Sequence, residues 1–419
     1  MKKHKVLKLF LPLFVAAILA CLLLLIPSSL GHHYTKSQLN AAATNPGSRK
    51  NFVGYSLKNQ ALSDKSFLPI MGSSELEKFN SFHPSVFAAK YNLPYTPYLI
   101  GMPGTQSLAQ YFYLTSVATH MKNRKLMFII SPQWFTPKGL SSDLFDNFVS
   151  KGEVYTWLES VNPKLPASQA LAKRLIALHS LNSDYVLANA IQKVAKGKDI
   201  GNLDGLEITL AHQVWRSEDD FFSSIGTSES SISALTRYQK ALPKTNNPAK
   251  LQQLAIQEGA KNASNNPFQI NNAVWTHKIS KSYQKRAGQM KNVSYLQSPE
   301  YSDFQQLLNA FAANHDEVEF VIQPVNGKWY DYTGLSQTML QDFAQKIKTQ
   351  LTSQGFTHIA DFTNNASTSY FIGDTIHFGT VGWLAFDEVM EQYMAKPYST
   401  PHYHLNNSTY LSKNWQQES

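Results

Sequence analysis

The sequence predicts an α/β protein, with a three-layer, doubly wound parallel sheet, a helical insertion and one N-terminal transmembrane helix. The main observation is that an apolar run of strand length, a polar turn and a helical pattern recur between residues 67 and 135. This alternation is typical of a parallel sheet with helices on both faces. The second observation is the composition: of 419 residues, 43% are hydrophobic and 16% are charged, which allows a large buried core. The third is a basic N-terminus followed by a long apolar run.

The first part of the α/β catalytic domain is expected at 63–140. Three apolar runs predict its strands, at 67–71, 95–100 and 125–130. A short helix is expected at 75–89, broken by Pro84. Before this part, residues 28–62 are rich in Ser, Asn, Lys and Gly without a steady period, which favours a linker or approach segment.

From 141 to 295 the sequence changes to Leu, Ala, Lys, Gln and Glu with helical spacing, which predicts a helical insertion. Residues 296–419 are expected to complete the α/β domain and to end in a polar, aromatic tail. Strand character returns at 318–325 and 358–362, and helices are expected at 336–354 and 381–394.

Residues 1–27 are predicted to form a cytoplasmic basic tip and a membrane anchor. Residues 1–8 contain four lysines and no acid, and 9–26 is an uncharged apolar run of 18 residues. As a helix, this run would be roughly 27 Å long, enough to cross the hydrocarbon core of a bilayer. The lysines favour a cytoplasmic N-terminus, so the catalytic domain of this single-pass protein is expected outside the cell membrane. A cleaved signal peptide is the alternative, although the run is long for one.

The chain carries a net charge of +9 and one cysteine, Cys21, which lies within the apolar run. The remainder therefore has no disulfide, even in a compartment that would allow one. A positive excess outside a membrane favours anionic envelope polymers or lipid head groups as partners over nucleic acid. Ordinary solubility charge is the alternative explanation.

The first candidate functional residue is Ser74, in Gly72-Ser73-Ser74 directly after the first predicted strand. Ligands of open α/β sheets bind outside the carboxyl ends of the strands, so a serine at this point is placed for chemistry. Taken alone, the pattern is more often a turn followed by a helix N-cap. Either Ser73 or Ser74 is a possible nucleophile; Ser74 is preferred because it takes the third place of Gly-x-Ser.

The second candidate is the segment between Gly373 and Gly379, which contains Asp374 and His377. It is the only Asp-x-x-His in the chain, and a carboxylate at this spacing can orient an imidazole that acts as a base. A doubly wound sheet would return this loop to Ser74, which gives a serine backed by a base and an acid.

Donors to an oxyanion are expected near the same edge of the sheet. The candidates are backbone amides after Ser74, the amide of Gly104 after the second strand and the side-chain amide of Gln133 after the third. Turn glycines and loop amides more often have no such role.

No motif indicates a metal or a nucleotide cofactor. The chain contains no His-Glu-x-x-His, no Gly-x-Gly-x-x-Gly and no phosphate-binding Gly-x-x-x-x-Gly-Lys. We therefore expect a reaction carried by side chains and backbone amides alone.

These positions resemble the motifs of the SGNH, or GDSL-type, hydrolases. The Gly-Asp-Ser block of that family is matched by Gly72-Ser73-Ser74, its second-block glycine by Gly104, and its terminal Asp-x-x-His by Asp374 and His377. Ser73 replaces the aspartate of the first block, and Gln133 stands where the third block carries Gly-x-Asn-Asp. The resemblance implies a serine-hydrolase fold with a Ser-His-Asp triad.

A longer resemblance, over essentially the full chain, is to the DltD family of D-alanyl transfer proteins in Gram-positive bacteria. It rests on the basic N-terminus with its single anchor and on four stretches in the same order, 72–75, 131–135, 324–332 and 373–377. It implies an external acyltransferase that esterifies the glycerol hydroxyls of lipoteichoic acid, a poly(glycerol phosphate), with D-alanine. It also implies a partnership with a multispanning MBOAT-type acyltransferase in the membrane, supplied indirectly by a D-alanyl carrier protein.

In that reaction Ser74 would carry the D-alanyl ester, and His377 would deprotonate first the serine and then the glycerol hydroxyl. The ammonium group of D-alanine suggests an acidic or aromatic lining, for which Glu75, Trp134 and Trp329 are candidates, although each aromatic is more often core packing. Two alternatives use the same sequence features. One is an esterase or thioesterase with the same triad; the other is a non-catalytic scaffold that binds teichoic acid and docks the acyltransferase.

Overall fold

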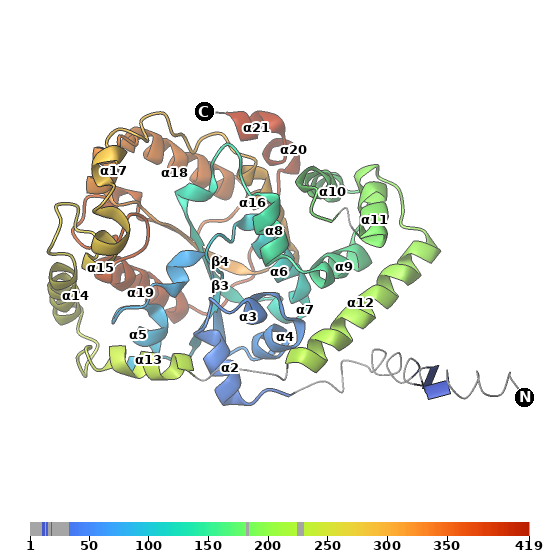
Figure 1. The fold of residues 1–419 in the computed structure, drawn as a ribbon, viewed down its shortest axis with the longest axis horizontal. Helices are drawn as coiled ribbons and strands as arrows, with labels where there is room; N and C mark the ends of the chain where they lie inside the picture. The colour runs from blue at the N-terminus through green and yellow to red at the C-terminus, as the bar shows by residue number, and fades with distance from the viewer. Residues whose placement is uncertain are drawn as a thin grey trace, which may run out of the picture.

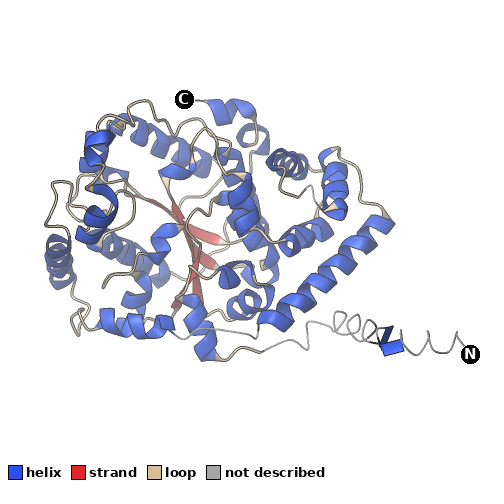
Figure 2. Cartoon of the chain, in the orientation of Figure 1, coloured by secondary structure: helices blue, strands red, loops and turns tan. Residues whose placement is uncertain are grey.

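A five-stranded, wholly parallel sheet forms the centre of the molecule, and helices surround it (Figures 1 and 2). The computed structural model describes residues 33–181, 184–223 and 230–418, together with positions 11, 12, 14, 15 and 18. The strand order is β2-β1-β3-β4-β5. The strands are β1 (Phe67–Met71), β2 (Thr96–Ile100), β3 (Lys125–Ile130), β4 (Glu317–Ile322) and β5 (Ile359–Asp361).

The two faces of the sheet are covered by different helices, because successive side chains of a strand point to opposite faces. Met71, Phe128 and Phe320 belong to one core cluster, and Ile70, Ile129 and Val321 belong to the other. The main helices of the first face are α4 (Tyr55–Ser63), α6 (Ser107–Ser116), α7 (Ala118–Met121), α16 (Glu300–Asn314), α17 (Gly327–Thr333) and α18 (Gln337–Thr352). Those of the second face include α5 (Pro84–Lys90) and α19 (Thr380–Ala395). The α/β class and the parallel sheet predicted from the sequence are confirmed.

The region expected as a helical insertion, 141–295, contains no strand among its described residues. Its helices divide between the two faces of the sheet. The first face receives α8 (Ser142–Phe148), α9 (Lys151–Ser160), α10 (Pro166–Leu178), α11 (Tyr185–Ala195) and α12 (Asn202–Ser223). The second receives α13 (Ser230–Gln239) and α14 (Pro248–Asn262), and α15 (Asn272–Val274) follows. In Figure 1, α9 to α12 lie on the right of the sheet and α14 lies on the left.

The irregular approach segment expected at 28–62 is helical from Lys36 onward. It contains α2 (Lys36–Ala43), α3 (Arg49–Val53) and α4, and Ala43, Phe52 and Leu57 of this segment are buried in the first core cluster. The helices are short and Ser- and Asn-rich, so their apolar positions do not repeat often enough to show a period. The chain ends with α20 (Asn407–Tyr410) and α21 (Lys413–Gln417), which pack against α16 through Tyr410 and Trp415.

Most of the predicted anchor, 1–27, lies outside the described residues. Among the residues that are described, no helix is both long enough and apolar enough to cross a membrane.

The loops at the carboxyl edge of the sheet determine where a functional site can lie. The order β2-β1-β3 means that the chain turns to one side after β1 and to the other side after β3. A crevice opens where the winding direction reverses, and ligands of doubly wound sheets bind there. The turn after β1 begins at Gly72, directly at this point.

Candidate active site

Ser74 lies just past the carboxyl end of β1, at the start of a 3₁₀ turn, Ser74–Glu77. The strand is followed by Gly72, whose N–H donates to Ile100 O of β2 and whose carbonyl accepts from the side chains of Thr105 and Gln110. A Cβ atom on Gly72 would lie 2.2 Å from Glu75 Oε1, so a larger residue here would displace the buried Glu75 carboxyl group. The hydrogen bonds of Gly72 therefore fix the direction in which the chain leaves the sheet before Ser74.

Asp374 and His377 lie in a tight loop between Ile372 and Phe378, which form an isolated antiparallel bridge. The Gly373 N–H donates to His377 O at 2.8 Å and closes the loop. A Cβ atom on Gly379 would lie 2.2 Å from Tyr370 O, which explains the glycine at the end of the loop. The segment is a bridged loop followed directly by α19.

A continuous chain of hydrogen bonds joins the three predicted residues. Ser74 Oγ lies 2.7 Å from His377 Nε2, and His377 Nδ1 lies 2.7 Å from Asp374 Oδ2. The backbone N–H groups of Ile376 and His377 donate to Asp374 Oδ1, at 2.8 and 2.9 Å. Burial acts to raise the pKa of Asp374, but the hydrogen bond and charge of His377, together with these two backbone donors, hold it below its usual range. The carboxylate is thus ionised and in place to accept a hydrogen bond from Nδ1–H, which leaves Nε2 as the acceptor for the serine hydroxyl.

Ser73 has a different environment. Its side chain is buried, and its Oγ donates to Met102 O and accepts the Gly104 N–H, each at 3.2 Å. Gly104 has φ +95°, a conformation that favours glycine. The Gly104 amide, predicted as an oxyanion donor, is therefore paired with Ser73 in this structure.

Glu75, predicted to line the site, is wholly buried beneath the turn. Its Oε1 accepts the Ser73 N–H at 2.5 Å. Burial raises the pKa of Glu75, and hydrogen bonds from the Ser73 and Glu75 amides and the charge of His377 oppose that rise. In this structure the carboxyl group supports the turn that presents Ser74.

Gln133 follows β3 and is oriented by Ser131, whose Oγ donates to Gln133 Oε1 at 2.5 Å. Its Nε2 is buried beside the aromatic side chain of Tyr330 on α17. Burial raises the pKa of Tyr330 above its usual range. The Gln133 Nε2 has no hydrogen-bond partner among the described residues.

The two tryptophans predicted as lining are packed in the core. The ring of Trp134 contacts Phe128 of β3, with ring centroids 5.9 Å apart. Trp329 packs on Phe268 and Tyr332, and only 3% of its surface is exposed. Neither ring has a described contact with Ser74 or His377, in agreement with the more common role of aromatic residues.

Two supporting residues were not predicted. The Asn326 Nδ2 donates to Asp374 O at 2.9 Å and to Phe268 O at 3.0 Å. The backbone N–H of Asn326 donates to Thr375 O. Asn326 therefore connects the Asp/His loop to the start of α17. His83, buried and stacked on Phe79, lies 3.1 Å through its Nε2 from Leu76 O in the serine turn. The Asn326 position lies in the stretch 324–332 that carried the family resemblance; no local pattern marked His83.

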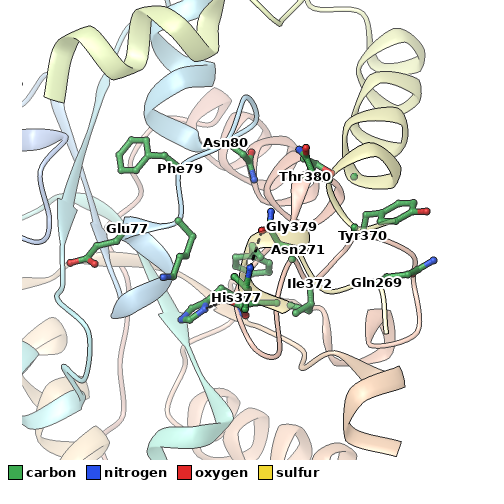
Figure 3. Close-up of a pocket in the computed structure, with 18 residues that line it drawn as sticks. Glu77, Phe79, Asn80, Gln269, Asn271, Tyr370, Ile372, His377, Gly379 and Thr380 are labelled. Carbon is green, nitrogen blue, oxygen red and sulfur yellow. Dashed lines mark hydrogen bonds and ion pairs between the residues drawn. The ribbon is translucent and has the colours of Figure 1, made fainter. Parts of the chain in front are cut away.

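An open pocket of about 310 Å³ adjoins the imidazole of His377 (Figure 3). Asn80 and Thr380 lie on one side of it, and Gln269 and Tyr370 lie on another. The carboxylate of Glu77 points away from His377 in this view. Among the described residues there is no group of three His, Cys, Asp or Glu side chains that could hold a metal ion.

The fold and the site define an α/β protein with a hydroxyl, an imidazole and a carboxylate in series at the carboxyl edge of a parallel sheet. A family model described as DltD protein matches residues 45–395. The chain is 36% identical to Protein DltD of Lacticaseibacillus rhamnosus over 409 residues, which cover 97% of this chain and 96% of the relative. It is 32% identical to Protein DltD of Bacillus subtilis (92% and 97% covered) and 28% identical to that of Staphylococcus aureus (93% and 96% covered). The chain therefore belongs to the DltD family, which is part of the D-alanylation system.

Proposed function

We propose that this protein is a membrane-anchored, extracellular acyltransferase of the SGNH serine-hydrolase type that transfers D-alanine to the glycerol hydroxyls of lipoteichoic acid. The observation that carries the proposal is the series Ser74 Oγ, His377 Nε2 and Nδ1, and Asp374 Oδ2, with both hydrogen-bond distances at 2.7 Å. A scaffold would not need a serine hydroxyl paired with an imidazole that is itself oriented by a carboxylate. Family membership supplies D-alanylation as the process.

The acylation step begins at Ser74. His377 Nε2 takes the hydroxyl proton while Oγ attacks the carbonyl carbon of an activated D-alanyl donor. The bond from that carbon to the donor's leaving group then breaks, and the leaving group takes the proton from His377. Asp374 stabilises the imidazolium throughout, and its ionisation is maintained by the contacts that lower its pKa.

The transfer step uses the same groups in reverse. His377 removes the proton from a glycerol hydroxyl, the alkoxide oxygen attacks the D-alanyl ester, and the bond to Ser74 Oγ breaks. The proton passes from His377 to Ser74, so the free enzyme is restored. Gln133 is a candidate donor to the oxyanion of both tetrahedral intermediates, since its Oε1 is held by Ser131 and its Nε2 is an N–H donor at the carboxyl edge of the sheet.

Ser74 is the nucleophile in this proposal, and Ser73 has a structural role. Ser73 Oγ is buried between Met102 O and Gly104 N, and Ser74 Oγ is partly exposed and paired with His377. The lysines and apolar run of residues 1–26 support the anchor and the extracellular location. The resemblance to the DltD family supports an MBOAT-type acyltransferase as the membrane partner and a carrier protein as the indirect source of D-alanine.

The test is the D-alanine ester content of the cell envelope in a strain whose only copy carries Ser74→Ala. We expect the esters to be lost while the membrane abundance of the protein stays normal. Wild-type ester levels at normal abundance would refute the covalent mechanism and leave the non-catalytic scaffold as the function.

To separate transferase from esterase, the purified full-length protein is given an activated D-alanyl donor with and without poly(glycerol phosphate). A transferase forms polymer ester, whereas an esterase releases free D-alanine at the same rate in both cases.

A further inference from the structure

A second hollow of about 440 Å³ adjoins the pocket beside His377. Asn262, near the end of α14, lines both. On the opposite wall, Asn80 lines the first hollow and its neighbour Ser81 lines the second. The two hollows together form a groove that follows α14 from the catalytic imidazole towards α13. The part of α14 that lines the second hollow, Leu254 to Asn262, spans roughly 12 Å.

The wall formed by α14 is held firmly against the catalytic loop. The Thr380 Oγ1, at the start of α19, donates to Ala255 O of α14 at 2.7 Å. A Cβ atom on Gly259 would lie 2.5 Å from Tyr370 Cβ, so the helix backbone at Gly259 packs directly against the Tyr370 side chain, in the segment before the Asp/His loop. The groove is therefore part of the folded core around the site.

The chemistry of the groove suits a linear chain of phosphates. Three cationic side chains line it, Lys78 near His377 and Lys261 and Arg237 farther along. Between them stand neutral side-chain amides that can donate hydrogen bonds to phosphate oxygens: Asn80, Asn262, Gln269 and Asn271. Three acids are also present, Glu77, Glu258 and Asp374, and the last of these is paired with His377. The Glu77 carboxylate points away from His377, close to Gly47, so it does not face the mouth of the site.

We infer that this groove, named here the α14 groove, binds a flexible poly(phosphodiester) in extended form and delivers one of its hydroxyls to His377. The inference rests on the proposed function for the identity of the acceptor, a poly(glycerol phosphate). The spread of the cations along the groove favours a repeating anion over a single phosphate, since Lys78 and Arg237 line different hollows.

The inference is tested by binding rather than by turnover. Full-length protein carrying Ser74→Ala, in detergent, is titrated with poly(glycerol phosphate) from which all D-alanine has been removed by mild base. We expect Arg237→Gln with Lys261→Gln to weaken binding about tenfold at low salt. Two lost phosphate contacts should also lower the slope of log affinity against log salt by roughly 1.4, by analogy with single-stranded nucleic acids. The side chains of Arg237 and Lys261 are exposed, so the variants should fold.

The matched control removes two exposed lysines of the other side of the protein, Lys196→Gln with Lys198→Gln. Both precede α12 and lie outside the α14 groove. We expect little change in affinity from this control and a two- to threefold gain from Glu258→Gln, which removes a repulsive charge. Equal losses in the groove variant and the control, or no loss in either, would overturn the inference. Weakened binding in the groove variant together with wild-type esters in the Ser74→Ala strain would retain the groove and refute the covalent mechanism.

Discussion

Lys58 and Glu153 form an ion pair in the interior of the protein, with Nζ and Oε1 2.5 Å apart and side chains that are 0% and 1% exposed. Lys58 comes from α4, in the segment predicted as a linker, and Glu153 comes from α9, in the predicted insertion. The ammonium group also lies over the ring of Tyr113 on α6. Charges in this position are retained only when paired, so the pair locks three separate parts of the chain together.

We therefore predict that Lys58→Met lowers the free energy of unfolding by about 3–5 kcal/mol, because it leaves Glu153 as an unpaired buried charge. Replacing both residues, as Lys58→Met with Glu153→Leu, should cost less than either change alone. Urea unfolding of the full-length protein measures the difference. The control is Lys164→Met, which breaks the exposed Lys164–Asp199 pair and should change stability by less than about 1 kcal/mol. Equal effects at the two pairs would contradict the assignment.

Asp374→Asn should leave the fold intact and lower the rate of acyl transfer on the order of 10³–10⁴-fold. The asparagine oxygen can still accept hydrogen bonds from the Ile376 and His377 N–H groups. Its NH2 group then faces His377 Nδ1, and this group donates a hydrogen bond instead of accepting one. The imidazole then turns its Nε2–H towards Ser74 and cannot act as the base. The rate is measured with an activated D-alanyl donor. Asp331→Asn, an exposed carboxylate bonded to Gln337, is the control and should keep the wild-type rate.

Ser73→Ala and Ser74→Ala should separate stability from activity. Loss of the Ser73 hydroxyl removes the acceptor of the Gly104 N–H, whereas Met102 O keeps the N–H and hydroxyl of Thr105 as donors. The free energy of unfolding should fall by about 1–3 kcal/mol while part of the activity remains. Loss of the Ser74 hydroxyl should change stability by less than about 0.5 kcal/mol and abolish activity. The reverse pattern in unfolding and ester assays would assign the nucleophile to Ser73.

His83 should make the protein sensitive to acid. Burial lowers the pKa of this imidazole to about 3, against the hydrogen bond at Leu76 O, which raises it. Between pH 6.5 and 3 the unfolded chain binds a proton that the folded protein does not, so this contribution to stability is complete above pH 6.5 and is lost as the pH falls. The expected slope is about 1.4 kcal/mol per pH unit.

His83→Gln removes the titrating group and keeps an N–H donor for Leu76 O. We expect its unfolding free energy to fall less between pH 7 and pH 5 than that of the unmodified protein, as measured by urea unfolding at both values. An identical pH dependence in the two proteins would show that the acid sensitivity comes from other groups.

The parallel sheet and the meeting of Ser74 with the Asp374–His377 loop were predictable because their signals are local. The strands β1 and β3 are largely apolar runs that end in a turn, and Asp374 and His377 are three residues apart on one loop. The position of this loop beside Ser74 could be predicted because the loops that follow parallel strands meet at the same edge of a doubly wound sheet. The hydrogen bonds of the site also depend on Gly104 and Gly379, and the reason for these glycines is visible only in the structure: Gly104 has a left-handed φ, and Tyr370 O approaches Gly379 closely.

Other features depend on contacts between distant segments and could not be read from local patterns. Pro84 was expected to break a helix, but it begins one, since proline is favoured in the first helical turn. Lys58 gave no signal as a core residue, because a buried lysine is explained only by its partner 95 positions away. Trp134 and Trp329 each follow a polar stretch that contains a residue near the site, Gln133 and Asn326 respectively. Both tryptophan rings are nevertheless buried in the core.

Because the Asp/His loop is closed by its own bridge, this site needs only one contact between distant segments, that between the loop and Ser74. The carboxylate, the imidazole and the amides that hold the carboxylate all belong to residues 374–377, so this half of the machinery forms as soon as the loop closes. Only the meeting of that loop with the serine turn has to be achieved by the rest of the chain. A displacement of β1 relative to α19 would therefore separate Ser74 from His377 and disconnect the site, with no change within either half.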